Sequence, residues 1–192
     1  MKKRVRDPEG KRIALLEAGL RLADENGMAN MSVNDVAAAA GVGKGSFYVH
    51  FVDRAAFLLE LHRGFHDALI EDIEAAVDGI KPGVDRLVAL TTAFLDTALR
   101  ERTVRALLLD ARAEPQIAGE IATRTSRVAR MIEQDLRAQA WPDPALAARL
   151  YLAMCTEAAL SELSRGRRDN ALRRSLFRYV TREGLPAPRG RR

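Results

Sequence analysis

The residues with the clearest chemistry lie in one short stretch, S-V-N-D-V-A-A-A-A-G-V-G-K-G-S-F-Y-V-H-F-V-D-R, which begins at Ser32. Ser32 and Asp35 have the spacing of a capping box, in which each side chain bonds a backbone N–H of the first helical turn. A helix is therefore expected to begin at Val33. Gly41 can adopt the left-handed conformation that ends a helix, so a turn is expected over residues 41–43.

A second helix of about two turns should follow this turn. Phe47 and Phe51 lie four residues apart and would share its inner side, whereas Lys44, Ser46 and Tyr48 would point outward. So short a helix needs support from its neighbours. A supported helix that carries amine and hydroxyl groups can enter the DNA major groove and reach phosphates and base edges.

The run G-V-G-K-G-S-F-Y-V-H-F, preceded by S-V-N-D-V-A and followed by D-R-A-A-F-L, resembles the DNA-binding signature of TetR-family transcriptional regulators. The resemblance covers about residues 13–60. It implies phosphate contacts from Ser32, Lys44, Tyr48, His50 and Arg54, and it places Lys44, Gly45, Ser46 and Tyr48 nearest the bases. The chain departs from the family at Gly43, where a Ser or Thr cap is common. The alternative is an ordinary helix–glycine–helix corner in an all-helical protein.

The composition favours an all-α protein. Hydrophobic residues make up 47% of the 192 residues and aromatic ones only 5%, and no segment alternates like a strand. A net charge of +5 suits a polyanionic partner. Cys155 is the only cysteine, which excludes an intrachain disulfide and favours a reducing cytoplasm. The resemblance implies a bacterial cytoplasm, with nucleoid association when the protein is bound to DNA. Apolar runs are too short for a membrane span.

Four segments are expected: a basic arm (1–10), a three-helix helix-turn-helix DNA-binding unit (11–54), a helical effector-binding and dimerisation bundle (55–184) and a disordered basic tail (185–192). Asp53 should cap a long helix that carries an apolar stripe from Phe57 to Val77. His62 and His66 on this helix could bind a metal if other ligands converged, but core packing is the favoured interpretation. No metal or cofactor is predicted.

The bundle should contain helices over 82–100, 101–112 and 114–140, a break at Trp141–Pro144, a helix to Ser164 and a final helix after R-G-R-R-D. Candidate ligand-binding residues, chosen for adaptable apolar or polar side chains, are Phe94, Arg105, Met131, Tyr151, Met154 and Glu157. Ordinary core packing is the competing interpretation. Candidate dimer-interface residues on the last two helices are Leu150, Met154, Ala158, Leu172, Leu176 and Tyr179.

These features predict a homodimeric, ligand-responsive repressor that binds a palindromic double-stranded DNA operator and is released by a small apolar or amphipathic effector of unknown identity. The alternative is an architectural or cell-cycle DNA-binding protein of the same fold that has no small-molecule effector. An enzyme is the weakest interpretation, because the sequence lacks a nucleophile elbow, a phosphate-binding loop and a metal motif.

Overall fold

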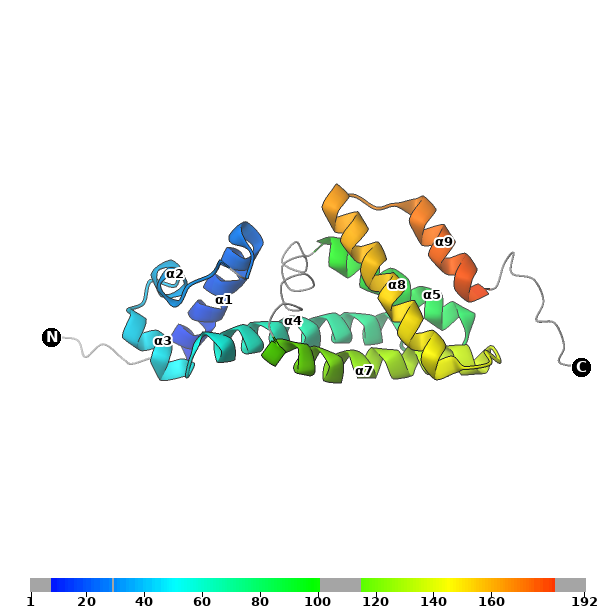
Figure 1. Ribbon diagram of the computed structural model, residues 1–192, viewed down its shortest axis with the longest axis horizontal. Helices are drawn as coiled ribbons and strands as arrows, with labels where there is room; N and C mark the ends of the chain where they lie inside the picture. Colours follow the sequence, from blue (N-terminus) through cyan, green and yellow to red (C-terminus); the bar gives the residue numbers. More distant parts are fainter. Residues whose placement is uncertain (1–7, 29, 101–114, 182–192) are drawn as a thin grey trace, which may run out of the picture. The chain divides into compact units, whose positions relative to one another are not determined.

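The computed structural model describes residues 8–28, 30–100 and 115–181, and every regular element in these ranges is an α-helix (Figure 1). The helices are α1 (Pro8–Asn26), α2 (Val33–Ala39), α3 (Lys44–His50), α4 (Arg54–Val77), α5 (Val84–Arg100), α7 (Pro115–Ala138), α8 (Pro144–Arg165) and α9 (Asn170–Thr181). The all-α prediction is confirmed. No helix in these ranges is long and apolar enough to cross a bilayer.

Some sequence-based predictions fall outside the described residues. These are most of the basic arm, the tail from residue 185 and the helix expected over 101–112. Helix α1 begins at Pro8, so residues 8–10, which were assigned to the arm, are helical. Proline suits this position because the first helical N–H has no partner within the helix.

The chain divides into two compact units. Unit 1 contains residues 1–68 and 101–123, and unit 2 contains residues 69–100 and 124–192. The division falls inside α4 and inside α7. In unit 1, helices α1, α2 and α3 pack against one another around an apolar core. The core consists of Leu15, Ala23, Met28, Met31, Val36, Phe47, Phe51, Phe57, Leu58 and Leu61.

The helix ends of unit 1 confirm the predicted signals. The Ser32 hydroxyl accepts a hydrogen bond from Asp35 N at 3.2 Å, and the Asp35 carboxylate accepts one from Ser32 N at 3.2 Å. Gly41 has a φ of +67°, the left-handed conformation that the turn requires. Asp53 accepts a hydrogen bond from Ala56 N at 2.7 Å and so caps α4. Gly43 precedes α3 without any side-chain cap.

Close helix packing in unit 1 depends on Gly19 in α1. A Cβ atom added at this position would lie 2.5 Å from Phe57 Cζ and 2.8 Å from Leu61 Cδ1. Real Cβ contacts are longer than this, so only glycine lets α1 approach α4 so closely at this point.

In unit 2, α5 packs against α8 and α9, and buried polar groups join these helices. The Tyr151 hydroxyl lies 2.9 Å from Thr91 Oγ1, which donates to Leu87 O at 2.8 Å. Burial raises the pKa of Tyr151 and raises the pKa of the Cys155 thiol to about 12. Cys155 is therefore a buried, protonated thiol rather than a reactive one.

An ion pair in unit 2 links α8, α9 and α5. Glu162 is fully buried and accepts two hydrogen bonds from Arg173, from Nε at 2.7 Å and from Nη2 at 2.5 Å. Glu162 also accepts from Asp169 N at 2.8 Å, and Arg173 Nη1 pairs with Asp96 at 2.5 Å. These bonds fix the turn between α8 and α9 and the position of α9 against α5.

A buried carboxylate links the start of α5 to the end of α7. Asp135 Oδ1 accepts hydrogen bonds from Gly83 N at 3.0 Å and from Arg86 Nε at 2.7 Å. The Arg86 guanidinium also donates to Met131 O at 3.2 Å. Burial raises the pKa of Asp135, despite the opposing hydrogen bonds from Gly83 and Arg86.

Candidate nucleic-acid interface

The inner side of α3 is fixed by aromatic packing. Phe47 has no exposed surface, and its ring centroid lies 5.4 Å from that of Phe51 and 5.2 Å from that of Phe57. Arg12 of α1 pairs with Glu60 of α4, and its guanidinium lies 5.9 Å from the Phe51 ring centroid. These contacts set the rotation of α3 about its own axis and so decide which side chains point outward.

The outer face of α3 consists of Lys44, Gly45, Tyr48 and Val49, all of which are exposed. Tyr48 is 49% exposed, and Val49 is 76% exposed. The outward direction predicted for Lys44 and Tyr48 is confirmed, whereas Ser46 is half-buried at the edge of this face. A primary amine and a phenol that share a protruding face provide donors for phosphates or base edges.

Gly45 has no role in packing within the described chain. A Cβ atom added there would meet nothing within 4 Å. Glycine costs about 1 kcal/mol relative to alanine inside a helix. Intrachain packing therefore does not require glycine at this position.

The other predicted phosphate-contacting residues lie around α3. Ser32 is exposed at the start of α2, and His50 is half-buried at the end of α3. Arg54 donates hydrogen bonds to Met31 O at 2.7 Å and to Met28 O at 2.6 Å. Arg54 therefore holds the α1–α2 connection against the start of α4, a structural task that the sequence did not reveal.

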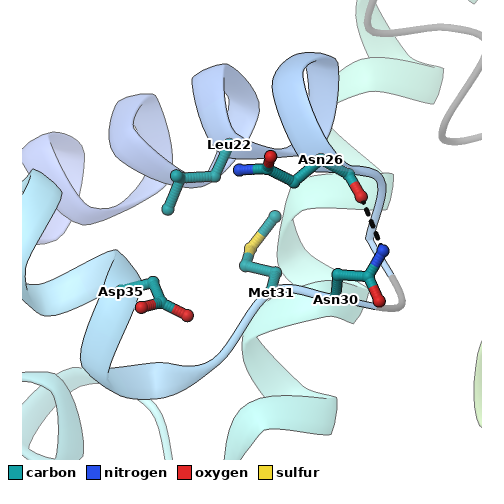
Figure 2. Close-up of a pocket in the computed structure, with 5 residues that line it drawn as sticks. All are labelled: Leu22, Asn26, Asn30, Met31 and Asp35. Atoms are coloured by element: carbon teal, nitrogen blue, oxygen red, sulfur yellow. Dashed lines mark hydrogen bonds between the residues drawn. The ribbon is translucent and has the colours of Figure 1, made fainter.

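Unit 1 contains a pocket of about 430 Å³ between the end of α1 and the start of α2 (Figure 2). It is lined by Leu22, Asn26, Asn30, Met31 and Asp35. Asn30 donates to Asn26 O at 2.9 Å, and the Asp35 carboxylate caps α2. Hydrogen bonds from the Ser32 side chain and backbone hold the pKa of Asp35 below its ordinary value. Because these groups already have local bonds, we assign the pocket no ligand.

The candidate ligand-binding residues do not line one described cavity. Phe94 and Tyr151 are buried, and the Tyr151 hydroxyl already bonds Thr91. Met131 is half-buried, whereas Met154 and Glu157 are exposed on α8. Arg105 lies outside the described residues.

Only part of the predicted dimer interface is exposed. Leu150 and Met154 are 53% and 36% exposed, but Ala158 and Leu176 are buried within the single chain. Leu172 and Tyr179 are half-buried, and the Tyr179 ring packs beside Trp141. In the single chain, Ala158 and Leu176 are therefore core residues and not part of an exposed apolar face.

The pitch of the α-helix explains why Ala158 of α8 is buried. Each step of four residues rotates the side-chain direction by about 40°, so a stripe drawn at this spacing drifts around the helix. Leu146 and Leu150 lie outside, whereas Ala158 has rotated into the core. Met154 and Glu157 continue the exposed line beyond Leu150.

His62 and His66 are both buried on α4, with ring centroids 4.4 Å apart. In the part of the chain that the structure describes, no third His, Cys, Asp or Glu joins them in a metal-binding group. Their burial agrees with the interpretation of these side chains as part of the core.

The arrangement of α1, α2 and α3 defines the class of protein: an all-helical protein with an N-terminal helix-turn-helix unit whose second short helix protrudes. Residues 15–61 match the family model described as bacterial regulatory proteins, tetR family. The N-terminal domain of this chain therefore matches the DNA-binding domain of the TetR family.

Curated relatives match over the same region. The HTH-type transcriptional repressor DhaR of a Mycobacterium species is 36% identical over 84 residues, which is 43% of this chain and 42% of that protein. The HTH-type transcriptional repressor KstR2 of Mycobacterium tuberculosis is 35% identical over 82 residues, or 43% of this chain and 41% of the relative. The matched region thus spans about two fifths of the length of these relatives.

Solved structures share the fold over most of the chain. The regulator FadR of Bacillus subtilis, solved in complex with stearoyl-CoA, has a TM-score of 0.77 at 16% identity, covering 91% of this chain and 99% of that one. A putative regulator of Saccharomonospora viridis in complex with choline has a TM-score of 0.76 at 21% identity, covering 90% of this chain and 96% of that one. At these identities the likeness establishes the fold.

Proposed function

We propose that this protein is a transcriptional repressor that binds double-stranded DNA through the outer face of α3. The observation that carries the proposal is the protruding face itself, where Lys44 and Tyr48 flank a glycine that intrachain packing does not require. The TetR-family match over the same residues and the repressor function of the curated relatives support it.

The proposal is tested by selecting bound fragments from random double-stranded DNA and measuring affinity for the selected site at several salt concentrations. Lys44→Ala should weaken binding and make the slope of log affinity against log salt shallower by about one unit, because one phosphate contact is lost. Lys81→Ala is the matched control, since Lys81 is equally an exposed lysine but lies in the α4–α5 turn. Equal slopes for wild type and Lys44→Ala would contradict this docking.

Ser32, His50 and Arg54 are proposed to contact phosphates beside α3. Ser32 is exposed and His50 is half-exposed, so both can be tested by alanine substitution. Arg54→Ala would also remove the bonds to Met28 O and Met31 O, so its effect on DNA binding must be compared with its effect on unfolding.

The repressor is proposed to act as a homodimer on a palindromic operator. Leu146, Leu150 and Met154 form an exposed apolar stripe on α8, and a second copy of the chain would remove it from water. A single reading head buries only about 600–1,000 Å² on DNA, so two heads are needed for tight specific binding.

Sedimentation of the wild type and of Leu150→Asp tests the dimer. The substitution should yield monomers with non-specific DNA affinity, while the fold persists because Leu150 is exposed. Leu176→Glu is unsuitable for this purpose, since it would place a charge in the core of the chain. A wild-type monomer at micromolar concentration that binds a palindrome tightly would refute the dimer.

Release by a small apolar or amphipathic effector is the third part of the proposal. Phe94, Met131 and Tyr151 of unit 2 are the described candidates for an apolar wall. Stearoyl-CoA, the ligand of the B. subtilis FadR structure, is a suitable first probe, with free CoA and choline as comparisons. An effector should raise the melting temperature and weaken operator binding, because it binds one conformation better than the other. A ligand that raises the melting temperature without changing DNA affinity would not be an effector.

A further inference from the structure

The outer face of α3 contains one large apolar side chain whose exposure intrachain packing does not explain. Val49 is 76% exposed and lies on a helix whose opposite side is fixed by the fully buried Phe47. Two residues along a helix correspond to a rotation of about 200°, so Val49 points away from the core. The packing of Phe47 against Phe51 and Phe57 prevents α3 from turning Val49 inward.

Val49 also shares a line along the helix with Gly45. The two residues are four apart, so they occupy the same side on successive turns. The helix surface at Gly45 is open, because a Cβ atom added there would meet nothing within 4 Å. A surface that approaches the backbone at Gly45 must therefore meet the isopropyl group of Val49 one turn further along.

The chemistry of the major groove decides what that group would contact. Phosphates and most base edges present hydrogen-bonding atoms, which an isopropyl group cannot satisfy. The C5-methyl of thymine is the apolar feature of the groove, and apolar side chains recognise it by contact. A valine on the outward line of a groove-reading helix thus matches thymine and disfavours the bare cytosine edge.

We propose that Val49 is a specificity-determining residue that packs its isopropyl group against the C5-methyl of one thymine in each half-site. This inference rests on the proposed DNA-binding function, and it adds a residue and a base that the predicted contact set did not contain. Lys44 and Tyr48 supply affinity from the same face, whereas Val49 supplies the preference for one base.

The experiment uses the full chain and the DNA site selected from random sequence. Each thymine of the site is replaced singly by deoxyuridine, which removes only the methyl group. For wild type, one thymine per half-site should be sensitive, with a loss of roughly fourfold per half-site, the factor expected for one buried methyl. In Val49→Ala, replacement of that same thymine should have no effect, because the contact is already absent.

Val52→Ala is the matched control. Val52 is 81% exposed, but it lies in the turn after α3. Helix α3 ends just before it, where Phe51 N donates to Phe47 O. This variant should respond to deoxyuridine as wild type does. The inference is overturned if Val49→Ala keeps the sensitivity at the same thymine, or if no thymine replacement affects wild type. Failure to select any DNA site would instead overturn the proposed function.

Discussion

Each of the two units of the chain is stabilised internally by a different kind of contact. The core of unit 1 is formed mainly by aliphatic, methionine and phenylalanine side chains, although His62 and His66 are also buried there. The hydrogen bonds described for this core lie mainly at helix ends and connections. Unit 2 buries Glu162 with Arg173, Asp135 beside Arg86 and Thr91 with Tyr151. Apolar packing tolerates small shifts, whereas each buried polar pair permits only one arrangement of its helices. Substitutions in the two units should therefore differ in cost and in cause.

The largest difference should come from the buried ion pair of unit 2. Glu162→Ala leaves the Arg173 guanidinium buried with only Asp96 as its acidic partner, so unfolding free energy should fall by about 3 kcal/mol, the low end for a broken buried pair. Denaturant unfolding measures this loss. Arg165→Ala is the control, because it removes an exposed pair with Asp169 and should cost less than about 1 kcal/mol.

A paired substitution separates charge from packing at the same place. Glu162→Leu together with Arg173→Met replaces both charges by apolar groups, so it should recover most of the stability lost in Glu162→Ala. A double variant as unstable as the single one would mean that Glu162 contributes through its bond to Asp169 N rather than through the ion pair.

The next largest changes in unfolding free energy, of opposite sign, are expected at two helical glycines of unit 1. Gly19→Ala forces a Cβ atom against Phe57 and Leu61, so it should destabilise the chain by about 1–3 kcal/mol. Gly45→Ala adds a Cβ atom in open space and should stabilise it by about 1 kcal/mol. Thermal and denaturant unfolding of both variants check these signs, and Gly45→Ala should also bind DNA more weakly. A stabilised Gly45→Ala that binds DNA normally would remove the case for close approach at α3.

A smaller loss is expected where one neutral hydrogen bond is removed from the core of unit 2. Tyr151→Phe deletes a buried hydroxyl but leaves Thr91 bonded to Leu87 O, so unfolding free energy should fall by about 1 kcal/mol. Denaturant unfolding at constant pH measures it. A loss several times larger would show that the hydroxyl supports more than the contact with Thr91.

The smallest effect should appear in the pH dependence of stability, again with opposite signs in the two units. In unit 1, hydrogen bonds from the Ser32 side chain and backbone lower the pKa of Asp35 from 3.8. Its contribution is present above pH 3.8 and is lost as pH falls through the folded pKa. In unit 2, burial raises the pKa of Asp135 above 3.8, so its contribution is present below pH 3.8 and is lost as pH rises through the folded pKa.

Comparison with Asp35→Asn and Asp135→Asn isolates these two carboxyl groups. As pH rises, the stability of wild type relative to Asp35→Asn should increase, and that relative to Asp135→Asn should decrease. Unfolding titrations at a series of pH values provide the measurement. Parallel trends for the two variants would be incompatible with the opposite pKa shifts.

The difference between local and long-range contacts explains which features could be predicted from the sequence. Capping residues and helical spacing are local, so the ends of α2 and α4 and the inward positions of Phe47 and Phe51 were predicted correctly. The burial of Glu162 and Arg173 was not predicted, because each charge looks like a surface residue until the helices are folded together. The bonds from Arg54 to Met28 O and Met31 O were not predicted either, because they span more than 20 positions of the chain.

Within the candidate site, the predicted contact set lacked Val49, whose role is proposed above from its exposure. Valine has no polar group that would indicate a DNA contact. Its four-residue spacing from Gly45, however, places Val49 on the outer face of α3. The ligand and dimer residues were harder to predict, because their exposure depends on rotations of α8 and α9 that accumulate along each helix.

The emptiness around Gly45 has a consequence for how such a protein can change over generations. Because a side chain added at Gly45 would meet no packed neighbour in the described chain, a substitution there can change DNA binding without disturbing the core. A duplicated copy can therefore acquire a new target sequence without first gaining compensating stability. Gly19, against which Phe57 and Leu61 are packed, allows no such drift.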